Sequence, residues 1–131
     1  MRVAIVAVLL VFALFVPLQA GSAVANACAG DCWVQISVPT YGPLNSNPSF
    51  AVSYGNLSNI TITGIVFMVI HNSIGQTVFI STATLQLGSD DSGTAYPVAF
   101  GLLPGQYQAT FFVTQPSGVA ISTSSTASFT V

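Results

Sequence analysis

The stretch Leu103-Pro-Gly-Gln-Tyr-Gln-Ala-Thr-Phe-Phe-Val-Thr114 indicates the fold class of this chain. A Pro-Gly pair near its start is typical of a tight turn. From Gln106 onward the residues alternate between the two faces of an extended strand. One face is apolar and carries Tyr107, Ala109, Phe111 and Val113, whereas the other is polar except for Phe112. The pattern predicts a β-strand over Gln106–Thr114 that buries one face.

Six other segments have a similar composition, in which Val, Ile, Thr, Phe and Tyr predominate between clusters of Gly, Pro, Asn and Ser. We expect these further strands at Trp33–Val38, Phe50–Tyr54, Ile60–His71, Thr77–Leu87, Thr94–Phe100 and Val119–Val131. Pro39 and Pro43 are expected to end the first of them. The run from Ile62 to Ile70 is apolar at nearly every position, which predicts a central strand or one covered on both faces. About seven short strands predict an all-β, antiparallel β-sandwich.

The turn before Gln106 carries a second signal. Leu103-Pro-Gly-Gln-Tyr107 resembles the L-x-P-G-x-Y entry into a late strand of immunoglobulin-like and fibronectin type III-like domains. The resemblance implies an immunoglobulin-like/fibronectin III-like sandwich, in which the Tyr107 hydroxyl forms a tyrosine corner by bonding to upstream backbone. It concerns architecture and does not identify a function.

The N-terminal residues are organised differently from the rest. Arg2 precedes an apolar run from Val3 to Val16, and small residues follow from Gly21 to Ala27. This is the layout of a secretory signal, so residues 1–27 are predicted to be an apolar signal helix and residues 28–131 one exported domain. Two alternatives stay open: an uncleaved membrane anchor, and a retained helix packed in a filament core as in type IV pilins. Contact with a membrane is expected only through this segment, if it is uncleaved.

Export permits two covalent modifications. Cys28 and Cys32 can form a small disulfide ring if a turn brings their Cα atoms within about 7 Å, with pairing between subunits or free thiols as the alternatives. Asn56-Leu-Ser58 and Asn59-Ile-Thr61 both satisfy the N-x-S/T sequon. We expect both sequons in one loop, where N-glycans on Asn56 and Asn59 would supply hydration that charged groups do not.

Charged side chains are nearly absent. They make up 3% of the sequence and consist of Arg2, Asp31, Asp90 and Asp91. Because residues 28–131 contain no Lys or Arg to neutralise phosphate, nucleic acid is excluded as a partner. The single His71 and the adjacent Asp90 and Asp91 suggest neither a nucleophilic triad nor a separated carboxylate pair. We therefore expect no enzyme, no cofactor and no metal site.

An exported, nearly uncharged sandwich with Ser/Thr-rich strands and candidate N-glycans resembles the subunits of archaeal extracellular filaments, the threads and bundling pili. The resemblance covers residues 26–131 in composition rather than through a diagnostic motif. It implies a homopolymer in which an N-terminal segment of one subunit completes the sandwich of the next by strand addition. The implied subunit contacts are Trp33, Val34, Ile36 and Val38.

The alternative function is a membrane-tethered or secreted domain for adhesion or display at the cell surface, or an archaeal virus coat protein. Both functions place the protein outside the cell. They differ in whether copies of the chain join end to end.

The signal prediction can be tested by intact mass. We expect the exported protein to begin between Val24 and Cys28, because small residues follow the apolar core at cleavage distance. A mass that includes Met1 through Ala23 would instead support the anchor or the retained helix.

Overall fold

The structure, a computed structural model, describes residues 32–131. The predicted signal segment and Cys28 lie outside this range. Within it the chain is all-β, and its eight strands are β1 (Val34–Ile36), β2 (Thr40–Leu44), β3 (Asn47–Asn56), β4 (Ile62–Asn72), β5 (Thr77–Leu87), β6 (Ser92–Ala95), β7 (Gln106–Thr114) and β8 (Ser125–Thr130). No helix in the described range is long and apolar enough to cross a membrane.

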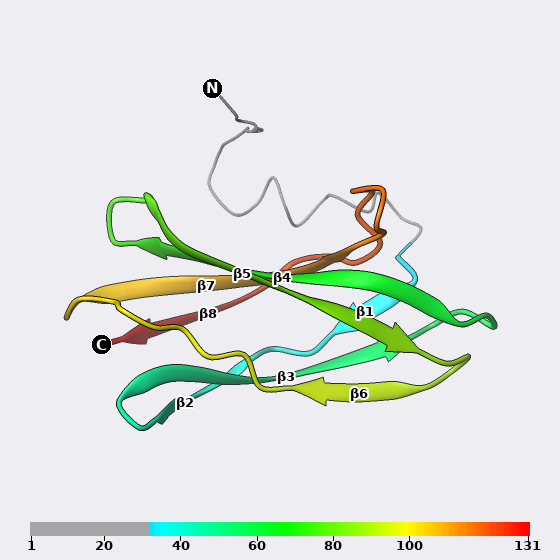
Figure 1. The fold of residues 1–131 in the computed structure, drawn as a ribbon, viewed down its shortest axis with the longest axis horizontal. Coiled ribbons are helices and arrows are strands. Elements are labelled where there is room, and N and C mark those ends of the chain that lie inside the picture. Colours follow the sequence, from blue (N-terminus) through cyan, green and yellow to red (C-terminus); the bar gives the residue numbers. More distant parts are fainter. Residues whose placement is uncertain (1–31) are drawn as a thin grey trace.

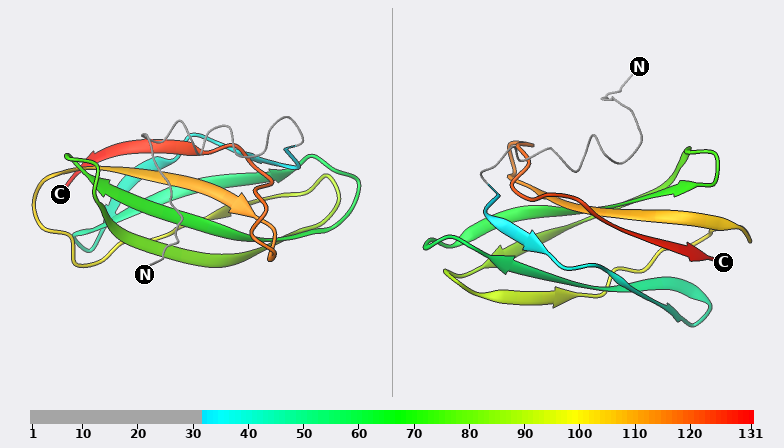
Figure 2. Two further views of the ribbon diagram at one scale, coloured as in Figure 1. Left: turned by 90° about the horizontal axis from the view of Figure 1, so that it is seen from above. Right: turned by 180° about the vertical axis from the view of Figure 1, so that it is seen from behind.

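The strands form two antiparallel sheets that lie face to face (Figures 1 and 2). One sheet has the order β5-β4-β7-β8. In the other sheet β3 is central, with β6 on one edge and β1 followed by β2 along the opposite edge. The expected all-β class and antiparallel pairing are therefore present.

β2 is the strand that the sequence prediction missed, so the described range has eight strands instead of about seven. β1 ends at Ile36, before Pro39, as expected, but pairing resumes in β2, which contains Pro43. β1 and β2 follow the same edge of β3, with one extra residue on their side. Pro43 is tolerated because β2 is an edge strand, where a missing N–H can face away from the sheet. Asn45 and Ser46, with φ of 49° and 70°, form the two-residue turn into β3.

β5 and β7 have the predicted bounds, whereas the remaining predicted strands differ at their ends. The largest change affects Val119–Val131, of which only Ser125–Thr130 is a regular strand. Before it, the Ser122 hydroxyl accepts a hydrogen bond from the Val113 backbone N–H at 2.8 Å. A side chain thus replaces a main-chain partner there, which alternating polarity alone does not reveal.

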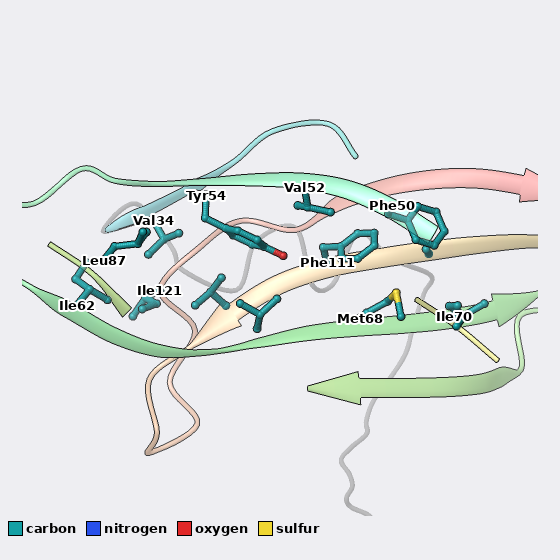
Figure 3. Packing of buried hydrophobic residues seen from close by; sticks show 14 of the residues in the cluster. Val34, Phe50, Val52, Tyr54, Ile62, Met68, Ile70, Leu87, Phe111 and Ile121 are labelled. Carbon is teal, nitrogen blue, oxygen red and sulfur yellow. The ribbon is translucent and has the colours of Figure 1, made fainter. Parts of the chain in front are cut away.

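The core lies between the sheets and takes aromatic rings from both. The ring centroid of Phe50 of β3 lies 5.3 Å from that of Phe111 of β7 and 5.1 Å from that of Phe129 of β8. Figure 3 shows side chains of β3 pointing toward those of β4 and β7. The largest fully buried side chains include Tyr54, Phe50, Phe111, Met68, Ile70, Val34, Val52 and Val113. Each such apolar side chain contributes about 1.5–3 kcal/mol to folding.

β4 lies between β5 and β7, as its continuous apolar sequence predicts. Its inward residues, such as Met68 and Ile70, are buried. Its outward residues Ile65, Phe67 and Val69 are only partly covered. The apolar character of β4 on both faces therefore produces a partly exposed apolar surface outside the core.

Gly64 of β4 lies against the end of β7. A Cβ atom at this position would lie 2.8 Å from Val113 Cγ1 and 3.0 Å from the Thr114 carbonyl oxygen. We expect Gly64→Ala to destabilise the protein by about 1–3 kcal/mol, because β7 or Val113 must move. Gly55→Ala is the matched control, since a Cβ on that β3 residue would meet no packed atom within 4 Å. Equal denaturant midpoints for the two variants would contradict the described packing.

Candidate interaction edge

Tyr107 makes the hydrogen bond that defines a tyrosine corner. Its hydroxyl donates to the Leu103 carbonyl at 2.6 Å, across the Pro-Gly turn that precedes β7. The ring also stacks on Phe129, with centroids 5.6 Å apart. Beside it, Gly105 and Val131 exchange two main-chain hydrogen bonds. The turn is thereby attached to the last strand of its sheet.

Asn56 and Asn59, the two sequon residues, occupy different environments. Asn56 is the last residue of β3 and is only 4% exposed, in contrast to the predicted loop position. Its amide nitrogen donates to the carbonyls of Ile60 at 2.7 Å, Leu87 at 3.3 Å and Gly88 at 2.9 Å. A glycan on this nitrogen would displace these bonds. Asn59 is exposed, so the folded domain can carry a glycan there.

Substitution of the two asparagines tests this assignment. Asn56→Asp replaces a donor by a buried carboxylate facing carbonyl oxygens, so we expect a loss of about 3 kcal/mol in the free energy of unfolding. Asn59→Asp makes the same chemical change at an exposed site, and we expect less than about 0.5 kcal/mol. Urea unfolding of unglycosylated protein measures both. Similar stabilities would mean that Asn56 does not hold the loop.

The predicted subunit contacts lie in or next to β1. Val34 is 1% exposed and Ile36 packs against the core, so both side chains are used within their own chain. Trp33 and Val38 are 39% and 78% exposed. β1 pairs with β3, and the N–H groups of Trp33 and Val34 both donate to the Ile121 carbonyl. Val34 and Ile36 are therefore unavailable to a neighbouring subunit in this structure.

Cys32 immediately precedes this segment and is disulfide-bonded. Cys28, its predicted partner, lies outside the described residues.

Within residues 32–131, His71 lies near the end of β4, whereas Asp90 and Asp91 lie between β5 and β6. Partial burial at the end of β4 lowers the pKa of His71 below its ordinary value. Asp91 accepts a hydrogen bond from the Ser92 N–H, and Asp90, with φ of 55°, donates its N–H to the Ser58 carbonyl. The two aspartates thus shape the turn between β5 and β6. Across residues 32–131 there is no group of three His, Cys, Asp or Glu side chains that could hold a metal ion.

Two buried hydroxyl groups, Tyr54 Oη and Thr110 Oγ1, have no hydrogen-bond partner within the described range. Burial raises the pKa of Tyr54, because the charged form would be desolvated in the core. Thr110 is next to Val69 on the outward side of β7. The fold tolerates both unsatisfied groups, and neither belongs to the edge described next.

β5 forms an edge of its sheet. It pairs with β4 over its full length, and no strand among the described residues pairs with its other side. At about 3.3 Å per residue, this row of N–H and C=O groups is roughly 36 Å long. β5 contains no Lys, Arg, Asp, Glu or Pro, the residues with which edge strands usually prevent pairing. It is therefore a ready acceptor for an added strand.

β8, at the opposite edge of the same sheet, is partly covered by its own chain. Val34 forms a parallel bridge with Ser122 just before β8. The Ser125 hydroxyl donates to the Ser37 carbonyl at 3.1 Å. Together these contacts attach the segment around β1 alongside β8. The two edges of the sheet therefore differ, and β5 is the more accessible one.

An apolar stripe adjoins the β5 edge on the outward face of the sheet. Val78 and Ile80 of β5 are 42% and 60% exposed, and Val69 of β4 is paired with Ile80. Next to them the rings of Phe67 and Phe112 stack, with centroids 4.9 Å and planes 6° apart. We call these five residues the outer stripe. An added strand would cover the outer stripe at the end that carries Val78 and Ile80.

Sequence reasoning predicted the bounds of β5 but did not identify it as an edge strand. The available signal was a run of eleven residues without charge or proline. That run is equally compatible with an internal strand, since edge and centre depend on which strands pair. Only the strand order distinguishes the two.

Comparisons with known proteins indicate the fold alone. No family model matches the chain, and no curated protein matches it either. Among solved structures it is similar to a β-glucuronidase of Bacteroides uniformis, with a TM-score of 0.58 and 13% identity over 74% of this chain and 13% of that one. It is also similar to a β-glucosidase of Streptomyces venezuelae, with a TM-score of 0.57 and 11% identity over 75% of this chain and 15% of that one. With an alkylpurine DNA glycosylase of Pseudomonas fluorescens, the TM-score is 0.55 and the identity 14%, over 76% of this chain and 30% of that one. The chain thus corresponds to a minor part of each of these structures.

Proposed function

We propose that this chain is a structural subunit of an extracellular filament, in which subunits join by β-strand addition. The observation that carries the proposal is the uncharged, unpaired edge of β5. A monomer would normally protect such an edge with charge or proline. Strand addition satisfies its main-chain groups and needs no ion pairs, which suits a chain with 3% charged residues.

The energetics require more than main-chain hydrogen bonds. An eleven-residue joint offers on the order of ten hydrogen bonds, each contributing about 0.5–1.5 kcal/mol net. Association itself costs about 4–15 kcal/mol in lost freedom. Hydrogen bonds alone therefore roughly offset that cost. Burial of Val78 and Ile80 supplies the apolar contribution that makes such a joint stable.

The proposed scaffold is an immunoglobulin-like/fibronectin III-like sandwich. The support for it is the Tyr107 bond to Leu103 and the two antiparallel sheets. The partners in this proposal are further copies of the same chain, with a possible N-glycan on the exposed Asn59. Export through the N-terminal segment, without an enzymatic role, completes the proposal.

A second candidate is a monomeric surface domain for adhesion or display. It is favoured by the burial of Val34 and Ile36 within their own chain, because the sandwich then needs no strand from a neighbour. The two candidates differ in one measurable property, the length of the assemblies.

Negative-stain imaging of the exported protein separates them. We expect filaments that persist at low pH and high salt, since no ion pair has to hold the joint. Particles of one or two copies at every concentration would overturn the filament proposal and leave the surface domain.

A further inference from the structure

We propose that the strand added to the β5 edge is β5 of a second copy, arranged antiparallel about a two-fold axis. This inference rests on the proposed use of that edge for assembly, and it names the partner. It does not use the predicted N-terminal donor. In such a joint two four-stranded sheets become one continuous sheet of eight strands.

The neutrality of the edge favours a second copy as the occupant. β5 carries no charge over Thr77–Leu87, so it offers no electrostatic selection for an acidic or basic segment. A second β5 is equally uncharged and equally long. Two such edges meet without like-charge repulsion and leave no charged group unpaired between them.

The aspartates determine the direction of pairing. Asp90 and Asp91 follow β5 directly, at one end of the edge. Parallel pairing in register would place the four carboxylates of two copies together. Antiparallel pairing separates the two aspartate pairs by about the length of the strand, roughly 36 Å, which exceeds the screening length of about 8 Å at physiological salt. The antiparallel arrangement therefore keeps the aspartates of the two copies apart.

The outward side chains also fit an antiparallel partner. Val78, Ile80 and Thr82 lie in one row on the outward face of β5. With Thr82 at the two-fold axis and the outward faces aligned, Ile80 lies opposite Thr84 of the second copy and Val78 lies opposite Gln86. The exposed Val78 and Ile80 then bury surface against these two side chains, next to Val69 and Phe67 of their own chains. Because Val78 and Ile80 belong to the outer stripe, the apolar contact of the joint reaches from the edge strand onto β4.

The two-fold joint closes after two copies, because each copy uses its only β5. A filament built from it would need a second, different contact between pairs. The pair is thus a measurable species whether or not filaments form.

A charge-swap experiment tests the joint with the full exported protein, below the concentration at which filaments form. Thr82→Lys places a cation at the middle of β5, where two copies would face each other, so we expect the dissociation constant of the pair to rise at least about tenfold in sedimentation equilibrium. Thr82→Glu should weaken self-pairing similarly. Mixing the two variants should restore pairs, because each joint then holds one Lys and one Glu. Thr126→Lys, at an exposed position of β8, is the matched control and should leave pairing unchanged.

The outcomes separate this inference from the proposed function. Native protein that stays monomeric, a Thr82→Lys variant that still pairs, or a mixture that fails to recover would each overturn the β5 joint. Filaments that persist in Thr82→Lys would place the filament contact elsewhere and preserve the filament proposal. Pairs that recover in the mixture, with no filaments from native protein, would support this joint and overturn the filament. Thermal melts of all four proteins check that each variant is folded.

Discussion

Phe50 lies between the two sheets and packs against aromatic rings from three other strands: Tyr41, Phe111 and Phe129, at centroid distances of 5.5, 5.3 and 5.1 Å. The rest of the domain depends on this inter-sheet contact because ion pairs cannot replace it. The single Lys or Arg of the chain is Arg2, so the described residues contain neither. Apolar packing between sheets is therefore the main force that fixes their relative position, and hydrogen bonds complete the fold at its ends.

Those ends are held by neutral groups in places where many proteins use charge. Asn56 joins the end of β3 to carbonyls of two loops, and Tyr107 joins the turn before β7 to its own strand. The Ser122 hydroxyl accepts from Val113 near the opposite end of β7. A neutral hydrogen bond loses little when pH or salt changes, since no proton or counterion is exchanged. The use of neutral side chains in place of charged ones thus also makes the polar contacts of the fold insensitive to pH and salt.

The strands whose sequence alternates most regularly were predicted best, because one covered face imposes the period of two. β7 has the predicted bounds for this reason, whereas the bounds of β5 follow from the turn residues Gly75 and Gly88 on its two sides. β2 was missed because Pro39 and Pro43 normally end strands, and only its edge position makes Pro43 acceptable. Asn56 was assigned to a loop because Asn commonly occurs there, whereas two of its three carbonyl partners belong to residues 31 and 32 positions away. Contacts at such separation are set by topology and are not readable from local pattern.

The candidate edge follows the same division between pattern and topology. Composition predicted that the chain lacks the charges that protect an edge, but strand order was needed to show that β5 is the edge concerned. An unprotected edge of this length has two possible fates in solution: unspecific pairing with any extended chain, or specific pairing with one partner. The outer stripe favours specific pairing, because Val78 and Ile80 are buried only by a partner strand whose faces, as well as its backbone, are aligned with those of β5. A register slip by one residue would turn those apolar side chains away from their counterparts. Apolar side chains beside an uncharged edge can therefore provide the selectivity that charge provides elsewhere.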